Sequence, residues 1–207
     1  APDDFRGKFG GEFTWEQWDE YARNYFPGRK VGCNAFGLPD RQTDRDRADA
    51  YIGSRIDGVN RFGMALTDPA ESAAELARRV RTNRLIGYKP YWNMVTGKQP
   101  DEITVFDMLP DAQLDAAARY GWIVTLHIPR SGRLADPVNQ RDMVELCRRY
   151  PAVTFLFAHI GRAYYKSGVE GFLDGIAACP NAWIDTAMVN HEGVLAYAFR
   201  NFPRDRM

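Results

Sequence analysis

Short apolar runs alternate along the chain with longer stretches in which apolar residues recur at helical spacing. The runs are nearly continuous in apolar residues, as expected for strands that are covered on both faces. They predict six strands, at residues 31–37, 59–66, 84–89, 122–128, 153–160 and 182–187. Because helical patterns lie between these strands, the sequence predicts parallel βα units and an α/β fold.

Helix start and stop signals predict six helices, at residues 15–25, 70–82, 111–120, 137–150, 168–179 and 192–202. Thr14 and Gln17 form a capping-box pattern at the first helix, and Asp68 followed by Pro69 opens the second. Gly121 is a predicted C-cap of the third. A proline follows each of the last three, and the residue before a proline disfavours a continuing helix.

The spacing of the predicted strands leaves two architectures open. Successive strands start 25 to 38 residues apart, which matches the about 31 residues per unit of a (β/α)8 TIM barrel. Six strands are too few to close such a barrel. The chain is therefore either an open doubly wound sheet or a barrel represented by about six βα units. No GxGxxG or GxxxxGK[ST] motif follows a predicted strand, so an open sheet would lack the usual cofactor-binding turns.

Composition and charge limit the partners that we expect. The chain has 207 residues, of which 45% are apolar and 26% are charged, so a disordered chain is excluded. The sequence contains no long uncharged apolar run and no visible signal peptide at residues 1–12. With 27 basic and 27 acidic residues the formal net charge is zero, which argues against nucleic acid or a membrane as partner.

Three widely spaced cysteines, Cys33, Cys147 and Cys179, form no CxxC pair. We interpret them as small buried residues without a disulfide framework, which fits a cytoplasmic protein. Aromatic residues of the first predicted helix, around Trp18 and Tyr21, are expected to pack in the core, although a homodimer face is possible.

Two of the three histidines, His127 and His159, come at the ends of consecutive predicted strands. Catalytic residues of βα barrels gather at this carboxyl-terminal rim. Neighbouring strands lie about 4.8 Å apart, so two imidazoles at adjacent ends can share one metal ion. Neutral imidazole suits zinc foremost, and also manganese, iron or nickel. The alternative is that each histidine is a hydrogen-bonded structural residue.

Strand alternation makes a separate prediction about these side chains. It places His127 on one face with Ile123 and Thr125. In the next strand it places His159 with Phe155 and Phe157.

Further candidates lie at the same predicted rim. Lys89 ends the preceding strand and either snorkels to the rim or points into the barrel mouth, where burial would lower its pKa. Gly87, two residues earlier, leaves space on the same face. Candidate substrate-binding residues in the loops are Tyr91, Arg130, Arg162, Tyr164 and His191. Arginines there can hold an anionic group, or can be ordinary solvated charges. For Asp185 we expect a structural, hydrogen-bond-accepting role.

The segments GYKPYW, TLHIPRSGR, RYPAVTFLFAHIGR and CPNAWIDTA, in this order, resemble the amidohydrolase-2 family of the metal-dependent hydrolase superfamily. The resemblance covers residues 58–207, the predicted barrel core. Residues 1–57, predicted to hold helices and one strand of the same single domain, are compatible with it. The resemblance implies a (β/α)8 TIM barrel in which the fifth and sixth strands carry metal-ligand histidines. With the predicted strands counted as two to seven, His127 and His159 match those positions.

The sequence also departs from this family pattern. The family uses an HxH pair on its first strand and an Asp on its eighth, and neither is present. The resemblance therefore implies a barrel without its first and last strands, with weak metal binding, no assigned catalytic base and no expected turnover. Lys89 falls on the strand where the wider superfamily can carry a carboxylated lysine, and that role stays open.

These observations lead to three functional hypotheses. The first is a metal-dependent hydrolase that acts on a small, carboxylated and hence anionic lactone, amide or ring substrate through metal-activated water. The second is a non-oxidative decarboxylase or hydratase, that is a lyase, on the same scaffold. The third is a non-catalytic α/β binding module, which would hold no metal.

Overall fold

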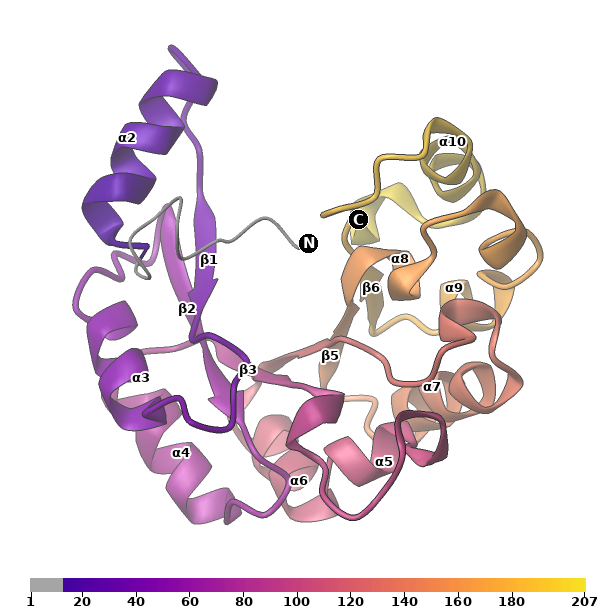
Figure 1. The fold of residues 1–207 in the computed structure, drawn as a ribbon, viewed down its shortest axis with the longest axis horizontal. Coiled ribbons are helices and arrows are strands. Elements are labelled where there is room, and N and C mark those ends of the chain that lie inside the picture. Colours follow the sequence, from indigo (N-terminus) through magenta and orange to yellow (C-terminus); the bar gives the residue numbers. More distant parts are fainter. Residues whose placement is uncertain (1–12) are drawn as a thin grey trace.

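The computed structural model describes residues 13–207 of the protein. Their framework is a single parallel sheet. Its six strands are β1 (Cys33–Phe36), β2 (Arg61–Thr67), β3 (Gly87–Pro90), β4 (Ile123–Leu126), β5 (Thr154–Phe157) and β6 (Ala182–Ile184). They pair in strictly sequential order. A doubly wound sheet reverses its order at a switch point, so the doubly wound interpretation is wrong. The sheet curves into an arc with helices along its outside, as a partial TIM barrel does (Figure 1).

Helices lie along the outer side of the arc, most of them between successive strands (Figure 1). They are α2 (Trp15–Tyr25), α3 (Arg45–Gly53), α4 (Ala73–Thr82), α5 (Val105–Met108), α6 (Asp111–Tyr120), α7 (Pro137–Arg149), α8 (Ala158–Arg162), α9 (Asp174–Ala177) and α10 (Glu192–Asn201). Short 3-10 turns lie at Trp92–Met94, Pro100–Glu102, Arg133–Ala135, Lys166–Gly168 and Arg204–Arg206. The capping box of Thr14 and Gln17 is present, and Gly121 caps α6 in the left-handed conformation, so both predictions are confirmed.

The structure contains three helices that were not predicted, α3, α5 and α8, and the predicted strand at 153–160 ends where α8 begins. The sequence of α3 is largely charged, and Asp44 caps it. Two predicted helices also differ in extent. Helix α4 begins after Ser72, because the carboxylate of Asp68 accepts a hydrogen bond from Ala70 N and closes a separate turn. The helix predicted at 168–179 is reduced to α9, since Gly171 takes a left-handed φ of 77° that interrupts helical geometry.

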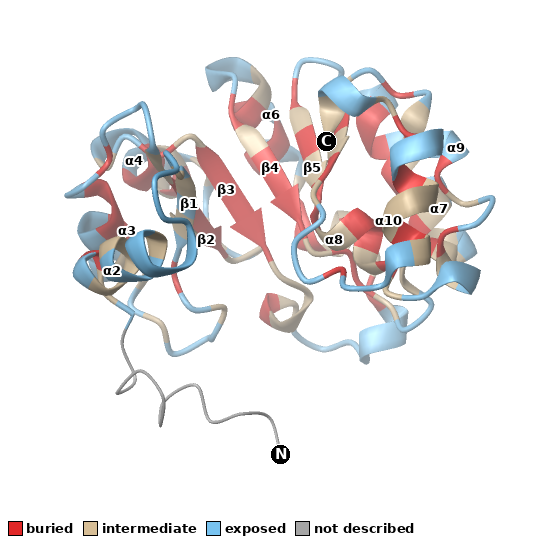
Figure 2. Ribbon diagram, turned by 90° about the horizontal axis from the view of Figure 1, so that it is seen from above, coloured by how far each residue is buried: buried red, intermediate tan, exposed pale blue. Residues whose placement is uncertain are grey.

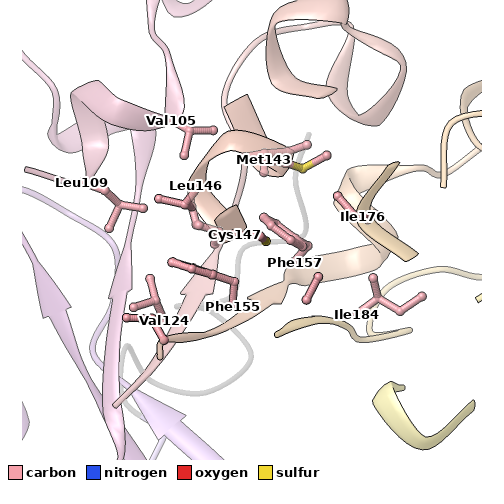
Figure 3. Packing of buried hydrophobic residues seen from close by; sticks show 14 of the residues in the cluster. Val105, Leu109, Val124, Met143, Leu146, Cys147, Phe155, Phe157, Ile176 and Ile184 are labelled. Atoms are coloured by element: carbon pink, nitrogen blue, oxygen red, sulfur yellow. The ribbon is translucent and has the colours of Figure 1, made fainter. Parts of the chain in front are cut away.

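The two faces of the sheet have different surroundings. Side chains of one register row, Ala65, Tyr88, Val124, Phe155 and Ala182, are fully buried in the core shared with the helices. Figure 3 shows Phe155 and Phe157 packed against Leu146 and Met143 of α7. Burial of one such side chain contributes roughly 1.5–3 kcal/mol. In Figure 2 the strands are mostly buried and the outer helix faces are exposed.

The opposite face of the sheet is the inner face of the arc, and it is more polar. Across it, the Thr125 hydroxyl on β4 contacts Met64 Sδ on β2 at 3.1 Å. Gly87 of β3 does not leave the open space predicted for it. A Cβ there would lie 1.9 Å from the carbonyl oxygen of Ile123. Glycine is therefore required because the β4 backbone approaches closely.

The sequence argued against a disulfide framework, a membrane span and a signal peptide, and the structure bears on the first two. All three cysteines are free, and Cys147 and Cys179 are buried. In residues 13–207, no helix has both the length and the apolar character that a membrane span requires. Residues 1–12, for which the sequence predicts no signal peptide, lie outside the described residues.

Candidate active site

The carboxyl ends of β3, β4 and β5 bring several predicted site residues together. Tyr91 and His127 form a bridge just beyond β3 and β4, with ring centres 5.5 Å apart. The ring centres of His127 and His159 are also 5.5 Å apart, at an interplanar angle of 76°. The ring of Tyr164 lies beside that of His159, with ring centres 6.3 Å apart. The two histidines therefore meet at the rim, as their positions at neighbouring strand ends indicate.

His159 reaches this position through an unusual turn. The residues from His159 to Arg162 all have φ between 53° and 60°, the left-handed region. Phe155 and Phe157 point into the helix-facing core, whereas the His159 ring faces His127. The prediction that His159 shares a face with these phenylalanines is wrong, because the left-handed turn ends the alternation at Phe157.

Asp185 and Ala187, which follow β6, hold His159 in place. Asp185 Oδ1 accepts hydrogen bonds from His159 N at 2.9 Å and from Ala187 N at 3.0 Å. Burial raises the pKa of Asp185, but the His159 side chain and the backbone hydrogen bonds from His159 and Ala187 outweigh it and keep the pKa below its usual value. The expected structural role of Asp185 is thus confirmed. His159 Nδ1 donates to the Ala187 carbonyl at 2.8 Å, which leaves the lone pair on Nε2 free for a ligand.

His127 stays neutral. Burial lowers its pKa to about 3, and the nearby charges of Arg162, His159 and Lys89 act in the same direction. Its Nδ1 atom is buried and, among the described residues, has no hydrogen-bond partner. Neutral imidazole is the form that binds a metal ion.

The geometry of the pair fits a shared ion. Two imidazoles on one tetrahedral ion, with bonds of about 2.1 Å, have ring centres about 5 Å apart, close to the 5.5 Å found here. The pair supplies two donors. Residues 13–207 contain no cluster of three or more His, Cys, Asp or Glu side chains with the spacing of a metal site. The metal-ligand roles of His127 and His159 therefore stay a prediction that this geometry suits.

Lys89 is buried at the same rim and is 6% exposed, so the snorkelling interpretation does not apply. Its Nζ atom lies 3.8 Å from the ring centre of Phe36 and 5.5 Å from that of Tyr91. Burial lowers the pKa of Lys89 to about 8, although the charge of Asp185 opposes this shift. Phe36 was not among the candidate site residues predicted from the sequence. It is the last residue of β1, and its position at a strand end could have indicated that it lies at this rim.

Replacing Lys89 with methionine should stabilise the protein by about 1–3 kcal/mol at pH 7, because it removes the cost of burying a charge. Loss of the cation–π contact with Phe36 offsets part of that gain. The folded-state pKa lies below the unfolded one, so wild-type stability rises as pH increases from about 8 to about 10.5. The advantage of the variant should therefore shrink across this window. Urea unfolding at pH 7 and pH 10 measures it.

Lys166→Met is the matched control for this prediction. Lys166 is exposed and pairs with Glu170, so its replacement should change stability by less than about 0.5 kcal/mol. A destabilised Lys89→Met variant at pH 7 would contradict the prediction.

Each of the remaining candidates has at least one side-chain nitrogen engaged by the protein, although Arg162 Nε is buried without a hydrogen-bond partner among the described residues. Arg130 donates from Nε to Asp136 at 3.0 Å and from Nη1 to the Asp101 carbonyl. Arg162 donates from Nη1 to backbone carbonyls of the loop after β4. His191 caps helix α10, where its Nδ1 accepts from Gly193 N at 3.1 Å. The structure thus places Tyr91 and Tyr164 beside the histidine pair, and it gives Arg130, Arg162 and His191 other partners.

Comparisons with known proteins agree with this fold. A family model described as Amidohydrolase matches residues 32–207. A search of curated proteins finds no match. Solved structures with the same fold include a 2,6-dihydroxybenzoate decarboxylase bound to 2,6-dihydroxybenzoate. That protein is 14% identical, with a TM-score of 0.59 over 100% of this chain and 80% of its own.

Two further similar structures contain manganese. A dihydroxybenzoic acid decarboxylase from Polaromonas sp. JS666, with 2-nitroresorcinol bound, is 16% identical, with a TM-score of 0.58 over 100% of this chain and 78% of its own. A 5-carboxyvanillate decarboxylase from Novosphingobium aromaticivorans DSM 12444 is 16% identical, with a TM-score of 0.52 over 78% of this chain. The match spans 57% of that enzyme. At these identities the likeness establishes the fold alone.

Proposed function

This chain belongs to the amidohydrolase family, and on that premise we propose that it uses a divalent metal ion, held by His127 and His159, to transform a small anionic substrate. The observation that carries the proposal is the convergence of these two imidazoles at the carboxyl-terminal rim of the sheet, where burial keeps His127 neutral. Two protein donors would leave room for water and substrate on a bound ion, as in catalytic rather than structural sites.

The ion supplies Lewis acidity, which polarises a substrate oxygen and lowers the pKa of water. The chain supplies orientation: the Ala187 carbonyl accepts a hydrogen bond from His159 Nδ1, so Nε2 is the nitrogen that would hold the ion. Zinc and manganese both accept imidazole ligands. Two of the structurally similar proteins carry manganese, so both metals belong in any test.

The proposed substrate is a small carboxylate. The buried ammonium of Lys89 has no carboxylate partner within ion-pair distance among residues 13–207, so an anionic substrate group can provide one. Tyr91, stacked beside His127, offers a flat surface to a ring. In this proposal Tyr164 lines the opposite side, next to His159.

Two reactions are compatible with such a site. Hydrolysis of a lactone or amide is the first, in which the metal activates water. Non-oxidative decarboxylation of a ring carboxylate is the second, and it is favoured by the three decarboxylases of similar fold. The substrate carboxylate would then lie near the ion and the Lys89 ammonium.

A substrate panel, with and without added Mn²⁺ or Zn²⁺, tests the proposal. Hydroxybenzoates are followed by CO2 release, and lactones and amides by ring opening or amine release. Metal-dependent turnover that a chelator abolishes supports the proposal, and the product identifies the reaction. A chain that binds neither metal overturns the metal site. A chain that binds metal but transforms no member of the panel points to a binding module.

A further inference from the structure

The turn that carries His159 is energetically unfavourable by itself. L-residues avoid the left-handed region, and the β-branched Ile160 lies there with φ 53° and ψ 46°. Four consecutive residues in this conformation persist only where the surrounding structure holds them. What holds this turn therefore also decides where the His159 ring lies.

One side of the turn is fixed to the end of β6. Ile160 N donates to the Asp185 carbonyl at 2.9 Å, and His159 N donates to the Asp185 carboxylate at the same distance. These bonds orient His159 relative to β6. They do not set its distance from β4, the strand that carries His127.

Arg162 fixes the other side of the turn to the loop that follows His127. Its Nη1 donates to Ile128 O at 2.9 Å, with Arg130 O at 3.2 Å and Pro129 O at 3.4 Å. Gly161 brings the backbone against the same region, since a Cβ there would meet Leu134 Cδ1 at 3.1 Å. The guanidinium thus ties the turn of one histidine directly to the loop of the other.

We propose that Arg162 is a positioning residue that sets the separation of His127 and His159, rather than a substrate contact. Its Nη1 is shared among three carbonyls, so a substrate carboxylate that bound this nitrogen would have to displace bonds that hold the loop. Arg162 Nε is buried and has no hydrogen-bond partner among the described residues. Lysine keeps the positive charge on one compact ammonium group, so it should reproduce these contacts only in part. The inference rests on the proposed metal site.

Mn²⁺ binding to the full chain, followed by electron paramagnetic resonance and calorimetry, tests this role. Arg162→Met should weaken Mn²⁺ binding about 10–100-fold, as loss of residues that orient metal ligands does. Arg162→Lys should restore part of the affinity. Arg148→Met, a change of the same type at an exposed position of α7, should leave it unchanged.

A second variant acts on the same turn without removing a charge. Gly161→Ala should shift His159 and alter the absorption spectrum of bound Co²⁺. The matched control is Gly121→Ala, where φ is also positive but no atom lies within 4 Å of the added Cβ. Both alanine variants introduce the same backbone strain, so a difference between them comes from the contact with Leu134 at position 161. This pair keeps the inference testable if Arg162→Met does not fold.

The results separate this inference from the proposed function. Wild-type Mn²⁺ affinity in Arg162→Met, with affinity lost in His127→Ala, overturns the positioning role and leaves the metal site intact. An unchanged metal affinity with a raised KM for anionic substrates would make Arg162 a substrate contact, and also overturns the role. If the wild-type chain binds no Mn²⁺, the metal site and this inference both fail.

Discussion

Replacing Arg79 with methionine should lower the free energy of unfolding by about 3–5 kcal/mol, the largest effect on stability that we expect. Arg79, on α4, is 1% exposed and fully paired. It donates to the Asp49 carboxylate on α3, to both oxygens of Glu71 at 2.8 Å, and to Leu66 O at 2.9 Å. Without the guanidinium, two buried carboxylates would remain with no positive partner.

The size of this loss should depend on pH. Burial raises the pKa of Asp49 to about 7, against the opposing charge of Arg79. The folded-state pKa exceeds the unfolded one, so wild-type stability falls as pH rises from about 4 to about 7. Removing Arg79 raises the pKa of Asp49 further. The loss of unfolding free energy caused by Arg79→Met should therefore be smaller at pH 5, where Asp49 can take up a proton, than at pH 8.

Urea unfolding of both proteins at pH 5 and pH 8 measures these differences. Arg78→Met is the control, since Arg78 is the neighbouring arginine of the same helix. It pairs with Glu75 and Asp46 at the surface, where an ion pair contributes about 0–1 kcal/mol. Equal losses of unfolding free energy in Arg79→Met and Arg78→Met would contradict the prediction that the buried ion pairs contribute more than the exposed ones.

The second large effect concerns metal binding. His127→Ala and His159→Ala should each weaken Zn²⁺ or Mn²⁺ binding by about 100-fold or more, because each removes one of two imidazole donors. At a metal concentration of about 100 times the wild-type Kd, the ion adds about 2.7 kcal/mol of stability. Both variants should lose most of that gain, which a thermal unfolding scan with and without metal detects.

His191→Ala is the matched histidine control for this experiment. His191 caps α10, so its removal should cost about 0.5–2 kcal/mol of stability and leave metal binding unchanged. A metal-dependent gain in Tm that survives in both His127→Ala and His159→Ala would place the ion elsewhere. Loss of the metal-dependent gain in Tm in His191→Ala alone would indicate that the metal binds near α10.

Much of the fold follows from local signals. Apolar runs locate all six strands, since a strand buried on both faces is continuously apolar. The capping residues Thr14 and Gly121 were read correctly, because a cap depends on a few neighbouring atoms. Helix α3 was missed, because its charged sequence hides a helix whose buried Asp49 is paired with Arg79, 30 residues further along the chain.

By itself the sequence determined the order of strands and helices, and it placed His127 and His159 at neighbouring strand ends. Both are properties of short segments, set by backbone geometry and by the period of the apolar residues. Tertiary structure alone decided which way His159 faces, that Lys89 rests on Phe36, and that Arg162 contacts the loop after β4 rather than solvent. Such contacts join residues that are distant along the chain, so they exist only once the sheet has brought its strand ends together.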